Sequence, residues 1–344
     1  MNGRKVPPKM SDVAQAAGVS VMTVSRAFRD NANVSRQTRL EILKIAEEMG
    51  YVFDRAASEL RTGRTGFVAV TVPSLNNPNF ADSVRGLTDG LSANGLEVLL
   101  GYTDYDIERE ETLIRQMLRR KPEALVVTGG THTPGTVDVL ARASVPVIEV
   151  WDEPNEPIDV SVGFSNAGAG SLMAGHLIEG GYQHIGFVGC SPGSDYRGEA
   201  RMRGFMETLD ANGLETHRTI EVGRPPIGAR EGVQAARTLL EKFPETDAVM
   251  CVADSVAYGM ITEFQREGIL VPGQVAVAGF GAYEMGAVGI PSMTTIDPNA
   301  YLMGSLAAKR IGQVLEGNPT SLKPTHVGAT PALIIRQSTR RDPR

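Results

Sequence analysis

Apolar and polar positions in the first thirty residues repeat with the period of an α-helix. Residues 10–29, MSDVAQAAGVSVMTVSRAFR, predict two short helices joined by a tight turn. We expect Ser11 to cap the first helix and Gly18 to end it in a left-handed conformation. Ser20 then supplies the cap of a second helix, which runs from Val21 through Phe28.

A third and longer helix is expected from Arg36 to about Met49, with Ser35 as its cap and Gly50 as its end. Its buried face should consist of the apolar residues Leu40, Leu43, Ile45, Ala46 and Met49. Small residues in the first helix allow two helices to cross closely, which favours a helix-turn-helix. An ordinary helical hairpin at the start of a globular domain is the alternative.

From Gly66 onward, apolar runs alternate with helical segments. Such runs are typical of strands in parallel sheets that are covered on both faces. Expected strands are 66–72, 97–103, 123–129, 145–150, 184–190, 216–222, 247–253, 274–280 and 331–336. Expected helices are 79–94, 106–120, one after the THTPG loop, 167–179, 198–212, 230–242, 256–267 and 299–315. Two such series predict two doubly wound α/β subdomains, in which ligands bind beyond the carboxyl ends of the strands.

The composition fits a protein of several domains. The chain has 344 residues, of which 42% are hydrophobic, so real cores are expected. The residues before Met10 contain no apolar run, so we expect no signal peptide. No apolar run in the chain approaches the ~20 residues of a membrane span. Cys190 and Cys251 lie in apolar strand-like stretches, which favours free, reduced thiols over a disulfide or a metal pair. We therefore expect a cytoplasmic protein without a membrane partner.

Charge is distributed unevenly along the chain. Residues 1–66 contain eleven Lys and Arg against seven Asp and Glu, a balance of +4. The remaining residues hold 23 basic against 33 acidic side chains, a balance of −10. A basic N-terminal module on an acidic body indicates that only the module meets a polyanion such as DNA.

The sequence gives no sign of an enzyme. No phosphate-binding glycine motif or nucleophile motif stands between a strand and a helix. The five histidines show no metal-ligand spacing, and no pair of nucleophile and base is recognisable. We therefore expect no catalytic residue, no metal and no cofactor. A sugar-binding protein or an α/β enzyme without operator control remains the alternative function.

Three segments carry a resemblance to a known family: DVAQAAGVSVMTVSRAF, NVSRQTRLEILKIAEEMGY and DRAASEL. In this order they resemble the lactose- and galactose-repressor family of bacterial transcription regulators, and the resemblance covers essentially the whole chain. THTPGT and VGFSN look most like its gluconate-repressor branch. The resemblance implies a DNA-binding headpiece, a hinge helix with its linker, and a body like a periplasmic binding protein. The implied boundaries are headpiece 1–52, hinge and linker 53–65, N-terminal subdomain 66–165 plus 295–325, and C-terminal subdomain 166–294 plus 326–344.

The resemblance also implies how DNA is read. Val21 and Met22 would read the major groove by shape, and Arg26 could donate two hydrogen bonds to guanine. In relatives, the leucine at the position of Leu60 wedges into the minor groove, and Ala57 lies where two hinge helices meet. Positions that contact phosphates or neighbouring bases in relatives are Ser20, Thr23, Ser25, Asn33, Ser35, Thr38 and Tyr51. For Thr23 and the serines, simple capping and solvation is the alternative, and for Arg26 a solvated helix charge.

In the body, the resemblance implies contacts with a small effector. The expected contact residues are Pro73, Ser74, Asn77, Phe80, Asp152, Phe164, Arg201 and Asp254. Arg201 is the most informative, because its fork of donors suits the carboxylate of a sugar acid. Its alternative is a surface charge. Ala253 and Gly281 stand where relatives carry polar ligand contacts, which leaves the effector's identity open. Thr131 and His132 could contribute, although we interpret His132 as an ordinary loop histidine.

Together these observations predict a homodimeric repressor. Two headpieces would bind the half-sites of a near-palindromic operator, because protein and DNA then share one symmetry axis. An effector between the subdomains would change how the hinge helices pair, and we favour release of DNA when a sugar acid binds. The C-terminal tail has no leucine heptads, so a dimer is expected and not a coiled-coil tetramer.

Overall fold

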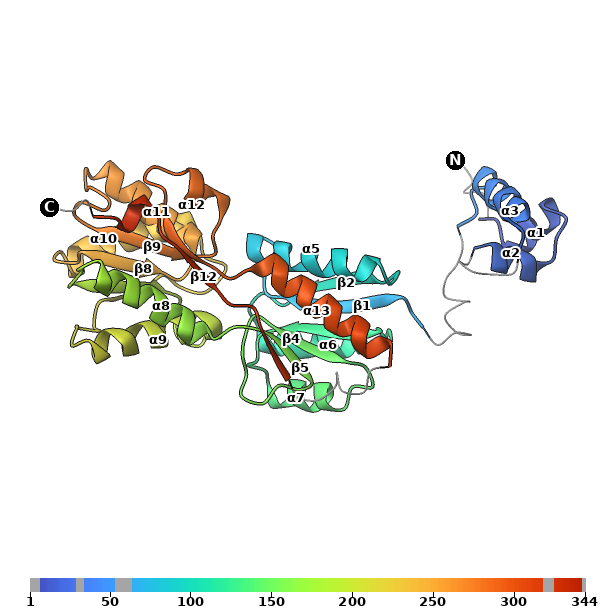
Figure 1. The fold of residues 1–344 in the computed structure, drawn as a ribbon, viewed down its shortest axis with the longest axis horizontal. Helices are drawn as coiled ribbons and strands as arrows, with labels where there is room; N and C mark the ends of the chain where they lie inside the picture. Colours follow the sequence, from blue (N-terminus) through green and yellow to red (C-terminus); the bar gives the residue numbers. More distant parts are fainter. Residues whose placement is uncertain (1–6, 29–33, 53–63, 318–324, 342–344) are drawn as a thin grey trace, which may run out of the picture. The chain divides into compact units, whose positions relative to one another are not determined.

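The computed structural model describes residues 7–28, 34–52, 64–317 and 325–341. They fall into two compact units, Met1–Thr65 and Gly66–Arg344 (Figure 1). This division coincides with the predicted start of the α/β body at residue 66. The predicted hinge helix lies outside the described residues.

The described part of the first unit contains the three predicted helices. They are α1 (Met10–Ala16), α2 (Val21–Ala27) and α3 (Arg36–Glu48). Gly18 (φ 64°) and Gly50 (φ 66°) adopt the predicted left-handed conformation after α1 and α3. Ser20 and Ser35 cap α2 and α3, as predicted. The helices enclose a small core of Val13, Ala14, Val24, Ala27, Ile42 and Ala46.

Two details of the headpiece prediction are wrong. Ser11 does not cap α1, because the cap is Lys9, two residues earlier, and Asp12 accepts a hydrogen bond from the backbone N–H of Lys9 (2.8 Å). Leu40 does not face the core but is 60% exposed. Ile42, which the prediction omitted, is fully buried instead, so the inward face of α3 is rotated from the expected one.

The first subdomain of the body is a parallel sheet of six strands in the order β11-β5-β4-β3-β1-β2. Its strands are β1 (Phe67–Val72), β2 (Glu97–Tyr102), β3 (Ala124–Thr128), β4 (Val147–Val150), β5 (Val160–Gly163) and β11 (Thr325–Gly328). Its helices are α5 (Pro78–Ser92), α6 (Ile107–Leu118), α7 (Pro134–Ala141) and α13 (Ala300–Leu315). Residues of α5 and α13 pack on one face of the sheet, and those of α6 and α7 pack on the other.

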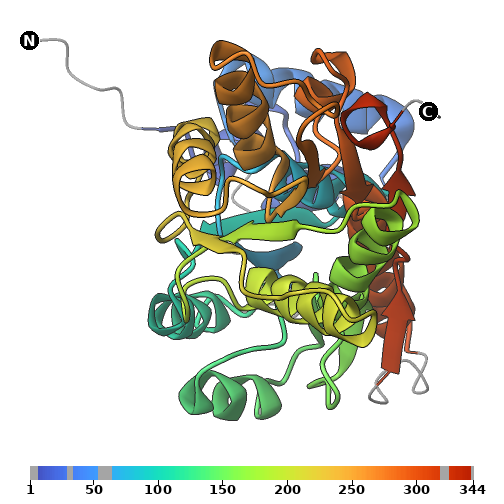
Figure 2. The same cartoon turned by 90° about the vertical axis from the view of Figure 1, so that its left-hand side faces the viewer.

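The second subdomain has the same architecture, with strand order β12-β10-β9-β8-β6-β7. Its strands are β6 (Ile185–Gly189), β7 (Thr219–Glu221), β8 (Ala248–Cys251), β9 (Ala276–Phe280), β10 (Thr294–Asp297) and β12 (Ala332–Ile334). Its helices are α8 (Asn166–Glu179), α9 (Tyr196–Ala211), α10 (Ala229–Lys242), α11 (Asp254–Arg266), α12 (Glu284–Val288) and the 3₁₀ helix η2 (Gln337–Thr339). Only β12 runs antiparallel to its neighbour. The helices α8 and α9 lie on one side of the sheet, and α10 and α11 on the other (Figures 1 and 2).

The central strands are mainly apolar because helices cover both faces of each sheet. Every residue of β3, β4, β6, β8 and β9 is buried, and Thr128 and Glu149 are the polar side chains among them. Such burial favours side chains that lose little on leaving water, which is why these strands read as nearly continuous apolar runs. The predicted fold class, a helical headpiece before two doubly wound subdomains, is confirmed.

The chain crosses between the sheets three times, and two crossings correct the predicted subdomain boundaries. Thr294–Asp297 was assigned to the N-terminal subdomain from residue 295, but it forms β10 beside β9 in the second sheet. Thr325–Gly328 continues beyond the predicted boundary at 325, because β11 pairs with β5 in the first sheet. The crossings therefore follow Gly163, Asp297 and Gly328. Parallel pairing with a neighbouring strand, which the residue pattern does not show, decides each assignment.

Candidate functional site

A cavity of about 300 Å³ lies between the two subdomains. Its walls are formed by the carboxyl ends of strands in both sheets and by the loops and helix starts that follow them, the place expected for a ligand in this architecture. The first subdomain contributes Ser74, Asn76, Asn77, Pro78, Asn79, Phe80, Tyr105 and Trp151. The second contributes Cys190, Asp195, Arg197, Arg201, Pro225, Pro226, Ile227, Gly228, Val252, Ala253, Ser255, Phe280, Tyr283 and Met285.

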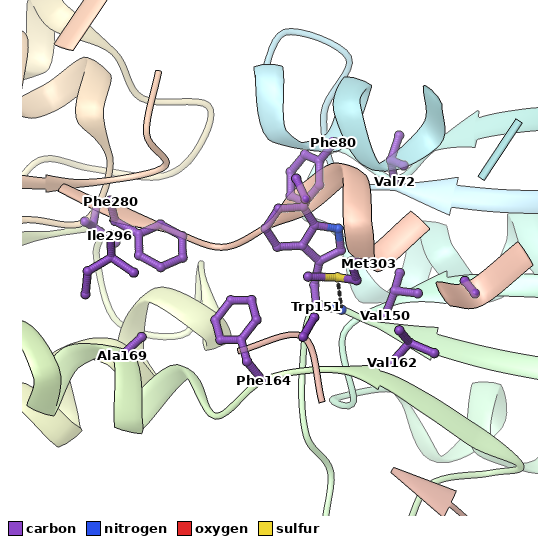
Figure 3. Close-up of a cluster of buried hydrophobic side chains, with 14 of the residues drawn as sticks. Val72, Phe80, Val150, Trp151, Val162, Phe164, Ala169, Phe280, Ile296 and Met303 are labelled. Atoms are coloured by element: carbon purple, nitrogen blue, oxygen red, sulfur yellow. Dashed lines mark hydrogen bonds between the residues drawn. The ribbon is translucent and has the colours of Figure 1, made fainter. Parts of the chain in front are cut away.

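A row of aromatic rings joins the two halves of this cavity. Phe80 and Trp151 pack edge to face with ring centroids 5.1 Å apart. Phe164, at the first crossing, lies between Trp151 (6.3 Å) and Phe280 (6.2 Å). Figure 3 shows these four rings converging from both subdomains, with the backbone N–H of Trp151 donating to the sulfur of Met303. The row gives the cavity an apolar wall against which the C–H faces of a ligand can pack.

Arg201 provides a buried cation at this wall. It lies on α9 and is 7% exposed. Its Nη1 donates to Asn166 Oδ1 (2.7 Å), and its guanidinium lies 4.1 Å from the centroid of Phe280. Its Nε is buried with no hydrogen-bond partner among the described residues. Burial lowers the pKa of Arg201, whereas the charge of Asp195, 3.7 Å away, raises it. An anionic ligand would supply the acceptors that Arg201 still lacks.

Arg197 brings a second cation to the same space. The backbone of Arg197 belongs to α9 in the second subdomain, but its guanidinium lies 5.8 Å from the centroid of the Phe80 ring in the first subdomain. A Cβ atom on Gly129 would lie 2.9 Å from Arg197 Nη1, so the glycine leaves room for this side chain. Arg197, Arg201 and Asp195 are the charged residues of the cavity wall. The described wall therefore carries two positive charges and one negative charge.

Two tyrosines approach Asn77 from opposite subdomains. The hydroxyl group of Tyr283 donates to Asn77 Oδ1 (3.0 Å). Tyr105 is positioned by two successive residues in the left-handed region, Asp104 (φ 59°) and Tyr105 itself (φ 58°). Such strain is found most often at functional sites. Burial and the charge of Asp195 raise the pKa of Tyr105 to about 12, so its hydroxyl group keeps its proton.

A smaller cavity of about 40 Å³ shares Tyr105, Asp195 and Arg197 with the main one. Its wall also includes Pro73 and Asp152. The three shared side chains thus separate two neighbouring spaces. The smaller space holds little more than a water molecule.

In the first unit, the outward surface of α2 is partly apolar. Val21 is 48% exposed and Met22 50% exposed, and Arg26 is exposed one turn later. The side-chain oxygen of Ser20 accepts from the N–H of Thr23 (3.1 Å) and so fixes the start of this helix. In the same way Ser35 Oγ accepts from the N–H of Thr38 (3.2 Å). The exposed turn therefore presents two apolar side chains and one cation from a rigid helix.

Family models match two parts of the chain. Residues 9–54 match the model described as bacterial regulatory proteins, lacI family, and residues 174–339 match the periplasmic binding protein-like domain. The HTH-type transcriptional regulator GntR of Escherichia coli K12 is 31% identical over 95% of this chain and 98% of that protein. The chain belongs to the lacI family.

Further relatives of this lacI-family protein agree with that assignment. The regulator IdnR of Escherichia coli K12 is 30% identical over 90% of this chain and 92% of its own. The crystal structure of a lacI-family regulator from Silicibacter pomeroyi is 32% identical, covers 97% of this chain and 100% of its own, and superposes with a TM-score of 0.89. These relatives fit the gluconate-repressor branch indicated by the sequence.

The protein is therefore a DNA-binding transcriptional regulator. Its relatives are regulators and not enzymes, which agrees with the prediction that the chain has no catalytic function. Among the described residues, no group of three or more His, Cys, Asp or Glu side chains is arranged to hold a metal. No helix in the described part of the chain is both long and apolar enough to cross a bilayer.

The structure brings together most of the residues predicted to contact an effector. Ser74, Asn77, Phe80 and Arg201 line the main cavity, and Pro73 and Asp152 line the smaller one. Phe164 lies within the row of rings but not in either wall. Asp254 is fully buried behind Tyr283, whose backbone N–H it binds. It is absent from both walls, so we do not include it among the proposed contacts.

The predicted DNA contacts lie mostly on the described part of the first unit. Val21, Met22 and Arg26 are exposed, whereas Ser20 and Ser35 cap their helices, as the alternative interpretation also requires. Tyr51 packs edge to face against Phe28. Thr23, Thr38 and Ser25 are partly buried. Asn33, Ala57 and Leu60 lie outside the described residues.

Several cavity residues were missed by the sequence reasoning. They are Tyr105, Trp151, Asp195, Arg197 and Tyr283. Each follows a predicted strand directly or by a few residues, and this position after a strand could have identified them as ligand contacts. His132, interpreted as an ordinary loop histidine, is instead buried, with Nδ1 2.7 Å from Glu110 Oε2. Burial lowers its pKa, but the carboxylates of Glu110 and Glu149 outweigh this and raise the value above the usual one.

Proposed function

We propose that this regulator is a repressor whose affinity for its operator is controlled by a gluconate-like sugar acid bound in the main cavity. The observation that carries the proposal is Arg201, a buried guanidinium with an unsatisfied Nε in a wall that holds two cations and one anion. A carboxylate would accept from this fork of donors. The hydroxyl groups of the ligand would meet Asn77, Asn79 and Asp195, which line the same space.

On the DNA side, α2 would enter the major groove. Val21 and Met22 would contact thymine methyl groups, and Arg26 would donate to guanine O6 and N7. The exposure of these three side chains supports this role. Ser20, Thr23, Ser25, Asn33, Ser35, Thr38 and Tyr51 would position the headpiece on phosphates. Leu60 and Ala57 of the hinge would add the minor-groove contact.

We also propose that the protein acts as a homodimer on a near-palindromic operator. The edge strand β2 exposes Leu100 and Tyr102, and the segment around α12 exposes Val288 (73%) and Ile290 (83%). Exposed apolar side chains that form one contiguous patch are typical of protein interfaces. A regulator that acts on the bacterial chromosome would work in the cytoplasm.

Ligand and DNA would be coupled through the three crossing segments. A ligand that binds both cavity walls favours one relative orientation of the subdomains, and hence one arrangement of the hinges. We expect the sugar acid to favour the arrangement that releases DNA. Allosteric coupling of this kind typically changes affinity by roughly 5- to 150-fold.

Binding of D-gluconate to the full-length protein tests the ligand, and Arg201→Ala tests its anchor. We expect D-gluconate, but not D-glucose, to raise the thermal midpoint and to release a fluorescent operator obtained by selection from random DNA. Arg201→Ala should weaken D-gluconate binding by roughly 10- to 100-fold, because a charged hydrogen-bond donor is lost. Operator binding without ligand should persist.

Arg203→Ala is the matched control. Arg203 is on the same helix, but its side chain is 65% exposed and pairs only with Glu207 at 4.0 Å. We expect this variant to respond like the unmodified protein. A normal response of Arg201→Ala to D-gluconate would show that Arg201 is not the anchor, and a response to neutral sugars alone would refute the sugar-acid class.

A further inference from the structure

Gly281 and Tyr283 occupy one end of the main cavity as an interdependent pair. Gly281 has φ 133°, a conformation that residues with a side chain rarely adopt. A Cβ atom built on Gly281 would lie 2.5 Å from Cε1 of Tyr283 and 3.0 Å from Nδ2 of Asn79. A side chain at position 281 and the ring of Tyr283 therefore exclude each other. The ring takes the space that the glycine leaves.

Tyr283 is held at both of its ends. Its backbone N–H donates to Oδ2 of Asp254 (2.7 Å), and Thr295 Oγ1 donates to Oδ1 of the same carboxylate (2.6 Å). Its hydroxyl group donates to Asn77 Oδ1 (3.0 Å). Asn77 caps α5 in the first subdomain, whereas Tyr283 precedes α12 in the second. The side chain thus spans the cavity between the subdomains, and only 9% of the residue is exposed.

The contacts of Tyr283 keep this end of the cavity neutral. Burial raises the pKa of its phenol well above the usual value, and the charge of Asp254 acts in the same direction. The hydroxyl group already donates to Asn77 and has no second proton to offer. An acidic side chain in its place would accept from the hydroxyl groups of a neutral polyol and repel a carboxylate. With Tyr283 there, Asp195 is the only acid in the described wall, and it lies beside Arg201 (3.7 Å).

We propose that Gly281 and Tyr283, as a pair, make the cavity select an anionic polyol over its neutral counterpart. This inference rests on the proposed sugar-acid effector and names the residues that set its class. Arg201 supplies the attraction for the acid group. The ring of Tyr283 over Gly281 keeps a second acid out of this end of the wall, so that Asp195 alone offsets the two cations.

D-gluconate and D-glucitol form a matched pair of probes, because they share one six-carbon chain and differ in the acid group at one end. The ratio of their dissociation constants is measured by calorimetry on the full-length protein. In the double variant Gly281→Asp with Tyr283→Ala, we expect this ratio to fall by at least about tenfold, because a carboxylate then faces the ligand's carboxylate. The double variant Gly281→Asn with Tyr283→Ala has the same shape without the charge, and it should keep most of the preference for D-gluconate.

Three outcomes separate this inference from the proposed function. An unmodified protein that prefers D-gluconate, combined with an unchanged ratio in the Asp variant, would overturn only the role of Tyr283. An equal fall in the Asp and Asn variants would also overturn it, because charge would then not be the cause. An unmodified protein that prefers D-glucitol would refute the sugar-acid effector and this inference together.

The packing of the pair is tested without any ligand. Gly281→Asp should lower the thermal midpoint strongly while Tyr283 is present and less strongly in the Tyr283→Ala background, because the two side chains compete for one space. Tyr283→Phe keeps the ring and should keep the selectivity ratio. Additive effects of the two substitutions would show that they do not share a site and would refute the inference even if no sugar bound.

Discussion

At the scale of single residues, Asp254 shows how a buried carboxylate links the cavity wall to pH. It is fully buried and receives hydrogen bonds from Tyr283 and Thr295. Burial raises its pKa to about 6, although both hydrogen bonds favour the ionised form. At a pH between the ordinary pKa of an aspartate and about 6, Asp254 keeps its proton in the folded chain, whereas it has already lost that proton in the unfolded chain. Ionisation of Asp254 therefore opposes folding.

The raised pKa of Asp254 predicts a specific pH dependence. From pH 4 to pH 7, the free energy of unfolding should fall by about 2 kcal/mol relative to the Asp254→Asn variant, which does not titrate at this position. Urea unfolding followed by the fluorescence of Trp151, the single tryptophan, reports on this unit. A difference between the two proteins that stays constant over this range would contradict the assignment.

The residues of the cavity show what a sequence can and cannot predict. Arg201 was predicted as a ligand contact, and it lies in the wall because its position follows from the strand before it and the helix that carries it. Asp254 was predicted on the same grounds, yet its side chain turns toward Tyr283. Tyr105 was missed, because its direction depends on a left-handed backbone at Asp104 and Tyr105. Residue patterns place the ends of strands, but they do not determine where each side chain points.

At the scale of elements, the positions of α8 and α9 depend on glycines at their contact. A Cβ atom on Gly204 of α9 would overlap the carbonyl oxygen of Ala167 of α8, and one on Gly170 would overlap that of Arg201. Because the helices touch through backbone, no side chain can move aside. This close contact fixes the depth at which α9 carries Arg201.

Gly204→Ala should therefore destabilise the protein by about 1–3 kcal/mol, because the added methyl group forces the helices apart. It should also weaken D-gluconate binding, since Arg201 moves with α9. Gly175→Ala on α8 is the control, because no atom lies within 4 Å of the added methyl group. That variant should gain about 0.5–1 kcal/mol, as expected for a glycine inside a helix. Equal effects of the two substitutions on unfolding would show that the contact is not tight.

The helices and strands that the sequence predicted are those whose own residues show a clear apolar pattern. The runs that became β3, β6 and β9 are apolar and wholly buried, so their pattern was sufficient. The strands β5, β10 and β11 were missed. β11 has the sequence Thr-His-Val-Gly and is only partly buried, so its pairing with β5 alone makes it a strand. Pairing between segments distant in sequence is a tertiary effect that local patterns do not contain.

At the scale of the whole molecule, the chain divides into two units at Thr65 and Gly66, and the proposed function assigns DNA reading to the first and ligand sensing to the second. The body, residues 66–344, should bind D-gluconate with the affinity of the full-length protein, because both cavity walls belong to it. It should show no specific binding to the operator. Calorimetry and fluorescence anisotropy measure the two properties independently. Retained operator binding by the truncated protein would refute this division of function.

The three crossings between the sheets also set the order in which the protein can mature on the ribosome. The headpiece is complete once its first fifty or so residues have emerged. Each body sheet, in contrast, waits for an edge strand near the C-terminus, β11 for the first and β12 for the second. At a bacterial synthesis rate of roughly 5–20 residues per second, the headpiece precedes the body by about 10–60 s. A nascent chain could therefore carry a folded DNA-reading module before it has any means of sensing a ligand.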